Sequence, residues 1–322
     1  MCVVENPIFP SQKAFRLQRR TTEPHHHRWI KAERRLARKL AGQRSGSVHS
    51  LPVTSQIERP IGVFDSGFGG LTVLRSLVEQ LPNEDFVYLG DTARAPYGPR
   101  SIAEVRRFAL QGLDHLVSGG VKALVIACNS ASSAVLRDAR ERYDVPITEV
   151  VLPAASRAVA ATRNGRVGVI ATQSTVNSRS YEDAFAIAPH ITLTAQACPR
   201  FVEFVEAGVT GGDELLSVAE EYLAPIKKAQ ADTLILGCTH YPLLQGVIGY
   251  VLGTGVTLVS SSEACAQSTY SQLMQAGLLR HQPREAVRTF LTTGDATDFQ
   301  GIGRRLLGGF VTDATVVDID KE

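Results

Sequence analysis

The chain has 322 residues, of which 44% are hydrophobic and 20% are charged, and its net charge is +2. This composition excludes a wholly disordered chain, and the length predicts enough core for two α/β domains. No stretch reaches the roughly 20 apolar residues of a membrane-spanning helix, and the start MCVVENPIFP lacks the layout of a secretory signal. We therefore expect a cytoplasmic protein with no membrane partner.

Residues 1–59 are predicted to be a basic extension without a stable fold. Residues 1–60 hold about a third of all lysines and arginines, few acidic residues and several prolines. An alternative is a short basic amphipathic helix through Trp29, Leu36 and Leu40 that binds an anionic surface or nucleic acid.

The reading frame offers a further alternative for this extension. Met1 and Met274 are the only methionines in the sequence. A bacterial start at another codon near Val48, Leu51 or Val53 would therefore be translated internally as Val or Leu, and the extension would be absent from the native protein.

From residue 60 onward, short apolar runs alternate with amphipathic segments such as 101–117. This pattern is typical of α/β proteins whose mainly parallel sheets are flanked by helices. The predicted strands cover residues 61–64, 86–90, 122–127, 146–148, 166–171, 191–195, 232–237 and 256–259.

The chain also contains an internal repeat. PIGVFDS (60–66) resembles RVGVIAT (166–172), and KALVIACNS (122–130) resembles DTLILGCTH (232–240). The repeat predicts two similar domains, with the active site in the cleft between them.

The five cysteines, Cys2, Cys128, Cys198, Cys238 and Cys265, are widely spaced and form no C-x-x-C pair. This pattern argues against a disulfide framework and against a metal site. A single cysteine of this kind is more often a small buried apolar residue than a reactive thiol. Cys128 and Cys238, however, occupy equivalent strand ends in the repeat, which favours a functional role for both.

Two thiols on matching domains suggest a particular reaction. If Cys128 and Cys238 face each other across a cleft, one thiolate can remove a proton from a carbon while the opposing thiol returns one to the other face. This inverts a stereocentre. Each cysteine also precedes a predicted helix, at 130–143 and 241–252, whose N-terminal amides are expected to lower the thiol pKa.

Polar residues beside the two cysteines are candidates for binding and proton transfer. Asp65 and His240 are placed to exchange protons with the thiols. Alternatively, Asp65 caps the helix that begins near Gly70, and His240 orders its turn through backbone hydrogen bonds. Candidate donors to substrate carboxylates are Ser66, Asn129, Ser130 and Thr239.

Two loops complete the predicted site. DSGFGGLTV (65–73) lacks both the third glycine of a dinucleotide-binding turn and the lysine of a P-loop, so its glycines favour an anion-binding turn and no nucleotide cofactor. Tyr97 and Gly98 in DTARAPYGPR (91–100) either border the cleft or belong to an ordinary connection.

With these motifs assembled, the chain resembles the glutamate racemases of the aspartate/glutamate racemase superfamily. GVFDSGFGGLTV, APYGPR, ACNSAS, GVIAT, CPRFVEFVE and LILGCTHYPLL occur in the family's order, and the likeness covers roughly residues 60–322. The resemblance implies a cofactor-independent isomerase that interconverts L- and D-glutamate and supplies D-glutamate for peptidoglycan and cell-wall synthesis. It also implies a first domain of residues 60–152 plus 262–322 and a second of 153–261.

The resemblance further assigns roles to individual residues. Cys128 would exchange the proton of D-glutamate and Cys238 that of L-glutamate, assisted by Asp65 and His240, with Glu206 a weaker candidate. The implied substrate-binding positions are Asp65, Ser66, Tyr97, Gly98, Asn129, Ser130, Thr239 and His240, with Thr172 and Thr175 as weaker ones. Ser130 stands where many members have Thr. We expect a homodimer, no cofactor and no metal.

Two other functions stay open from the sequence. The first is another two-cysteine racemase of the superfamily, acting on aspartate or a hydantoin. The second is nucleic-acid or membrane binding through the basic extension, which would leave the paired cysteine motifs unexplained.

Overall fold

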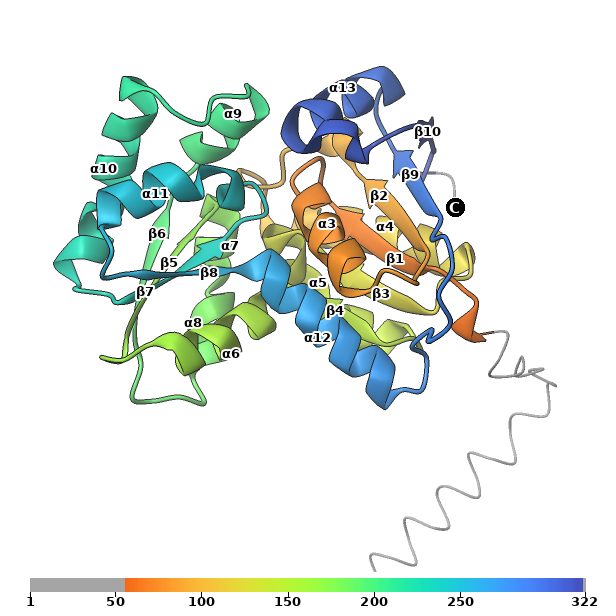
Figure 1. The fold of residues 1–322 in the computed structure, drawn as a ribbon, viewed down its shortest axis with the longest axis horizontal. Helices are drawn as coiled ribbons and strands as arrows, with labels where there is room; N and C mark the ends of the chain where they lie inside the picture. The colour runs from red at the N-terminus through yellow and green to blue at the C-terminus, as the bar shows by residue number, and fades with distance from the viewer. Residues whose placement is uncertain (1–55, 321–322) are drawn as a thin grey trace, which may run out of the picture. The chain divides into compact units, whose positions relative to one another are not determined.

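The computed structural model describes residues 56–320 and contains two separate parallel β-sheets (Figure 1). The first sheet has the strand order β10-β9-β2-β1-β3-β4, and the second has the order β6-β5-β7-β8. We call the part that carries the first sheet the first half and the part that carries the second sheet the second half. The strands are β1 Ile61–Asp65, β2 Phe86–Gly90, β3 Ala123–Ile126, β4 Ile147–Glu149, β5 Arg166–Ala171, β6 Thr192–Ala197, β7 Thr233–Gly237, β8 Thr257–Ser260, β9 Arg288–Thr292 and β10 Ala314–Val316.

Helices cover both sheets. They are α3 Leu71–Gln80, α4 Ile102–Ser118, α5 Asn129–Arg142, α6 Val151–Ala161, α7 Gln173–Ser178, α8 Ser180–Phe185, α9 Arg200–Glu206, α10 Asp213–Lys228, α11 Gln245–Leu252, α12 Ser261–Gln275 and α13 Ala296–Leu307, with 3-10 turns η1 Thr92–Arg94, η2 Tyr241–Leu244 and η3 Gly308–Phe310. In the first sheet, Val63 and Val125 face the core beneath α3 and α12, whereas Phe64 and Leu124 face the core beneath α4 and α5. Burial on both faces explains why these strands are continuous apolar runs.

The internal repeat is confirmed as a repeat of topology. The order β2-β1-β3-β4 in the first sheet recurs as β6-β5-β7-β8 in the second. β1 pairs with β3 as β5 pairs with β7, with Ala171 beside Gly237 at the end of the second pair. In such sheets the strand order reverses at this central pair, where ligands bind at the carboxyl ends of the strands.

The end of the chain returns to the first half. α12 packs along α3 in Figure 1, and its Cys265 and Leu273 lie in the same core as Leu74. All strands of the first sheet lie within residues 60–152 or 262–322, and all strands of the second lie within 153–261. Whether the two halves are domains with these boundaries stays a prediction.

The described residues on the N-terminal side of the expected boundary at residue 59 contact the first half. The carbonyl of Ile57 accepts a hydrogen bond of 2.8 Å from Lys122 Nζ, and the carbonyl of Glu58 accepts one of 2.8 Å from Arg280. The amphipathic segment through Trp29, Leu36 and Leu40 and the alternative starts near Val48, Leu51 and Val53 lie outside the described residues. None of the helices between residues 56 and 320 has the length and apolar character that crossing a bilayer requires.

Candidate active site

Cys128 lies at the carboxyl end of β3 and is the N-cap residue of α5. Its Sγ accepts a hydrogen bond of 3.4 Å from the Ala131 amide and lies 3.4 Å from Ser66 Oγ, to which it donates. We expected the helix amides to lower the thiol pKa. Burial, followed by the negative charge of Asp65, instead raises the pKa of Cys128 to about 12, because these effects outweigh the hydrogen bonds that link its Sγ to Ser66 and Ala131. The group is therefore a thiol at neutral pH.

Cys238 follows β7, but its surroundings differ from those of Cys128. The expected helix at 241–252 begins as the 3-10 turn η2 at Tyr241, with Pro242 in its first turn, and becomes α-helical only at Gln245. Cys238 is therefore not the N-cap residue of this helical segment, and the expected effect of its amides on the thiol stays a prediction. Its Sγ instead lies 3.7 Å from Nδ1 of His240.

The two thiols line the same cavity. Cys128 and Cys238 are 6% and 5% exposed, and the cavity between the halves has a volume of about 210 Å³. Its lining combines residues of both halves and includes Ser66, Tyr97, Gly98, Asn129, Ser130, Thr172, Glu206, Thr239 and His240. The cavity is small, its lining mixes apolar and polar side chains, and each half contributes one thiol to it.

His240 joins Cys238 to an acidic group. Its Nε2 lies 3.2 Å from Glu206 Oε1, at the end of α9, so the imidazole contacts a thiol and a carboxylate rather than the backbone of its own turn. Burial lowers the pKa of His240, but Cys238 and Glu206 together raise it further, to about 10. The ring is an imidazolium at neutral pH and places a positive charge beside Cys238.

Asp65 ends β1 and lies behind the cavity rather than on its wall. Its Oδ2 accepts a hydrogen bond of 2.9 Å from the Gly67 amide, and among the described residues its buried Oδ1 has no hydrogen-bond partner. Burial raises its pKa. α3 has Gly70 at its N-cap position, so Asp65 is not the capping residue of that helix.

Hydroxyl groups connect the two halves beside the cavity. Ser130 Oγ lies 2.9 Å from Thr172 Oγ1 and 3.4 Å from Thr175 Oγ1. Thr175 does not line the cavity, whereas Ser66, Ser130, Thr172 and Thr239 do.

Tyr97 and Gly98 line the cavity, so of the two interpretations of their loop the structure agrees with the one in which it borders the cleft. The phenol does not point its proton into the cavity, because it donates a hydrogen bond to Asp91. The Gly98 carbonyl accepts a hydrogen bond of 2.9 Å from the Ser174 amide, which ties the loop to the second half. Asp91 was not identified from the sequence, although its place directly after β2 is a signal of the same kind as that of Asp65.

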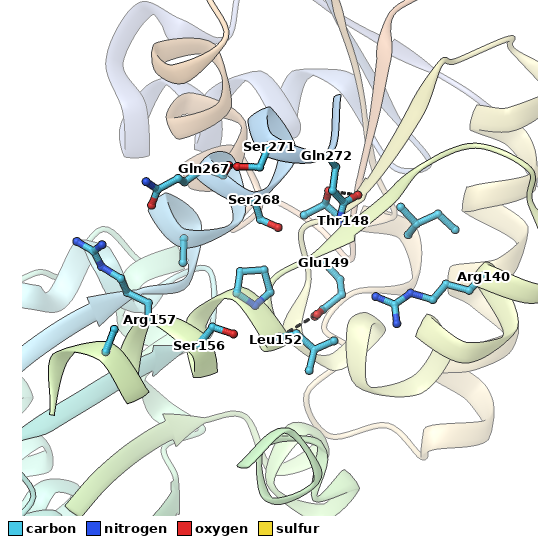
Figure 2. Close-up of a pocket in the computed structure, with 14 residues that line it drawn as sticks. Arg140, Thr148, Glu149, Leu152, Ser156, Arg157, Gln267, Ser268, Ser271 and Gln272 are labelled. Atoms are coloured by element: carbon cyan, nitrogen blue, oxygen red, sulfur yellow. Dashed lines mark hydrogen bonds between the residues drawn. The ribbon is translucent and has the colours of Figure 1, made fainter. Parts of the chain in front are cut away.

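A second pocket of about 500 Å³ lies among α5, α6 and α12 (Figure 2). Arg140 and Arg157 lie on opposite sides of Glu149, and the polar face of α12 forms another wall. The Glu149 carboxylate accepts hydrogen bonds from the amides of Val151 and Leu152 at the start of α6. Cys128 and Cys238 line the smaller cavity and do not line this pocket.

Paired α/β halves that each present one strand-end cysteine define a class, the two-thiol racemases. Residues 61–269 match the family model described as Asp/Glu/Hydantoin racemase. A glutamate racemase from Parafrankia sp. (strain EAN1pec) is 63% identical over 259 residues, which are 80% of this chain and 94% of the relative. This chain belongs to the Asp/Glu/hydantoin racemase family and, within it, to the glutamate racemases.

Solved structures agree with this assignment. The glutamate racemase isoform RacE1 from Bacillus anthracis superposes with a TM-score of 0.78 at 38% identity, covering 81% of this chain and 97% of that one. The glutamate racemase from Francisella tularensis subsp. tularensis SCHU S4, solved in complex with D-glutamate, gives a TM-score of 0.77 at 35% identity, covering 83% of this chain and 100% of that one.

Proposed function

We propose that the chain interconverts L-glutamate and D-glutamate with Cys128 and Cys238 as its two bases. The observation that carries the proposal is the arrangement of two buried thiols, from equivalent strand ends of the two halves, on one cavity. The relatives' activity and the D-glutamate complex support glutamate as the substrate. D-glutamate formed in this way would serve peptidoglycan synthesis.

The unequal surroundings of the thiols support a direction for each proton transfer. The high pKa keeps Cys128 protonated, whereas Cys238 lies beside the His240 imidazolium. With the protons distributed in this way, Cys238 acts as the base that removes the Cα proton of L-glutamate. Cys128 then returns a proton to the opposite face. The reverse distribution of protons, with Cys128 as the base, acts on D-glutamate.

The remaining site residues stabilise the carbanion-like transition state. We propose that Ser66, Tyr97, Gly98, Asn129, Ser130 and Thr239 bind the substrate through hydroxyl, amide and backbone groups. Asp65 and His240 adjust the charge beside the two thiols, and Glu206 supports His240. The cavity of about 210 Å³ leaves little room for water beside a substrate, which strengthens each of these interactions.

Circular dichroism of glutamate tests the two-base mechanism. We expect Cys128→Ala and Cys238→Ala each to lose steady-state racemisation in both directions, because one face of the substrate loses its proton donor. Cys265→Ala is the matched control: Cys265 is a free, buried thiol in the core beneath α12, and its loss should leave racemisation intact. Near-parental turnover in either active-site variant would refute the mechanism.

Substrate choice and assembly are separate proposals. A panel of glutamate, aspartate and hydantoins tests specificity, and turnover of aspartate without glutamate would overturn it. We also propose a homodimer, for which the exposed side chains of Ile187 and Tyr250 offer apolar contact area, and light scattering measures the mass.

The four described cysteines are free thiols, which supports a reducing, cytoplasmic location.

A further inference from the structure

Tyr181 connects the two halves directly behind the cavity. It lies on α8 in the second half, is 2% exposed and does not line the cavity. Its hydroxyl accepts a hydrogen bond of 3.0 Å from Nδ2 of Asn129, the residue that follows Cys128 and begins α5 in the first half. No local sequence pattern marks this tyrosine.

The ring of Tyr181 also contacts the strand that leads to Cys238. A Cβ atom built on Gly237 would lie 3.2 Å from Cε2 of Tyr181 and 2.8 Å from the carbonyl oxygen of Ile170, so only glycine leaves room for the ring and the neighbouring strand. One side chain therefore touches the residue after Cys128 and the residue before Cys238.

The backbone at the start of α8 is held in a strained conformation. Arg179, between α7 and α8, has φ 58° and ψ 21°, the left-handed region that is unfavourable for a residue with a side chain. Ser180 Oγ lies 2.7 Å from Ser133 Oγ, one turn along α5 from Asn129. Two consecutive residues of α8 thus bond to one face of α5, which fixes the position of Tyr181.

The bond to Tyr181 determines which end of the Asn129 amide is available to a ligand. Asn129 is 2% exposed and lines the cavity; its Nδ2 is bound to Tyr181, while its buried Oδ1 has no hydrogen-bond partner among the described residues. An amide oxygen only accepts hydrogen bonds. The carboxylates of glutamate are also acceptors, so the α-ammonium is the substrate's donor for this oxygen.

We propose that Tyr181 is a positioning residue, whose hydroxyl holds the Asn129 amide with Oδ1 toward the substrate α-ammonium. The inference rests on the proposed glutamate racemase function. Without the hydroxyl, the amide is free to turn its NH2 group into the cavity. The NH2 group and the substrate ammonium are both hydrogen-bond donors, so they form no hydrogen bond with each other. Because the ammonium is present in both the ground state and the transition state, the loss falls mainly on binding.

Tyr181→Phe tests the proposal, because it removes the hydroxyl and keeps the ring against Gly237. We expect KM for both enantiomers to rise about tenfold, the effect of losing one hydrogen bond to a charged group, with a smaller change in kcat. Asn129→Ala should raise KM as well, and adding Tyr181→Phe to it should have no further effect on KM. Independent, multiplying losses in the double variant would overturn the proposal.

Tyr143→Phe is the matched control. The Tyr143 hydroxyl forms hydrogen bonds too, but both partners lie in its own half: Asp114 at 2.7 Å and the Leu110 carbonyl at 3.3 Å. None of these three residues lines the cavity. Loss of this hydroxyl should lower the unfolding temperature and leave KM unchanged. Thermal unfolding of all variants separates a loss of stability from a change in KM.

Glutarate, which has both carboxylates and no ammonium, identifies the group that Asn129 recognises. Its competitive inhibition constant should be the same for the parent and Tyr181→Phe. Equal weakening of glutamate and glutarate would reject the ammonium contact. Failure of the parent to racemise glutamate would reject the proposed function itself, whereas an active parent with an unchanged KM in Tyr181→Phe would reject only the role of Tyr181.

Discussion

The Sγ atom of Cys238 lies 3.7 Å from Nδ1 of His240, two residues further along the same turn. The other ring nitrogen lies 3.2 Å from Glu206, so the imidazole is held between two groups that carry negative charge when ionised. These contacts raise the pKa of His240 to about 10 in spite of burial, which alone would lower it. At neutral pH the imidazole therefore places a positive charge beside Cys238.

This relationship predicts an alkaline limit to activity. We expect kcat/KM for L-glutamate to fall as the pH rises through about 10, where the imidazolium loses its proton, and His240→Asn to lower the rate at neutral pH and remove that limb. The measurement is a pH profile of racemisation, with His190→Asn, an exposed histidine, as the control. An unaltered alkaline limb in His240→Asn would assign it to another group.

The same shift affects stability in a defined direction. Because the folded-state pKa of His240 lies above its ordinary value of 6.5, its charged contacts stabilise the fold fully below that value. This contribution is lost as the pH rises through about 10. Denaturant unfolding should thus show a steeper alkaline loss of stability in the parent than in His240→Asn. Parallel curves for the two proteins would contradict this assignment.

The sequence predicted most of the sheets because buried parallel strands are continuous apolar runs. β2 and β5 have the predicted bounds, and the repeat correctly paired Cys128 with Cys238 at equivalent strand ends. β9 and β10 were not predicted. Arg288 and Val316 are exposed, and these two strands lie at the outer side of the first sheet, where the apolar pattern is interrupted.

The site was predictable where it follows the strand ends and not where it depends on contacts between distant segments. Tyr181 and Asn129 form a hydrogen bond although they are 52 residues apart in the sequence, and no periodicity or turn signal indicates such a pair. The raised pKa of the Cys128 thiol was not predicted either, because the sequence indicates a helix N-terminus but not how deeply the thiol is buried.

Gly69 packs against the turn that carries Cys238. A Cβ atom on Gly69 would overlap Thr239 Oγ1 and lie 2.5 Å from Cε1 of His240. We predict that Gly69→Ala displaces this turn and lowers kcat/KM on the order of a hundredfold, as expected for misplaced catalytic groups. Gly246→Ala is the control, because a Cβ there meets no atom within 4 Å, and its activity should equal that of the parent. Parental kinetics for Gly69→Ala would show that the turn tolerates displacement.

Thr72 ties α3 to the same turn from another side. Its hydroxyl donates to the Thr239 carbonyl at 2.8 Å, and its Oγ1 lies 3.2 Å from Ser262 Oγ. Thr72→Val should cost about 1–3 kcal/mol of unfolding free energy, because a buried carbonyl loses its donor, and should also reduce kcat. Denaturant unfolding and racemisation rates measure the two effects.

Thr269→Val is the matched control for Thr72→Val. The Thr269 hydroxyl is also buried, but it bonds at 2.9 Å to the Cys265 carbonyl within α12. This variant should lose stability without losing kcat. A proportional loss of kcat in both variants would mean that reduced stability, rather than the position of the Cys238 turn, limits turnover.

Lys122 fixes the strand that leads to Cys128. Its ammonium group is fully buried against the Glu84 carboxylate and donates to the carbonyls of Ile57 and Leu278 at 2.8 and 2.9 Å. Lys122→Met should therefore cost about 3–5 kcal/mol of unfolding free energy, because it leaves the Glu84 charge buried without its partner. Urea unfolding provides the measurement.

The control for this loss is Arg137→Met, which removes the exposed ion pair with Glu141, where both side chains are mostly in water. Its unfolding midpoint should stay close to that of the parent. The folded Lys122→Met protein should keep the parental KM, because Lys122 does not line the cavity. Similar small effects in both variants would show that the buried ion pair contributes little to holding β3 in place.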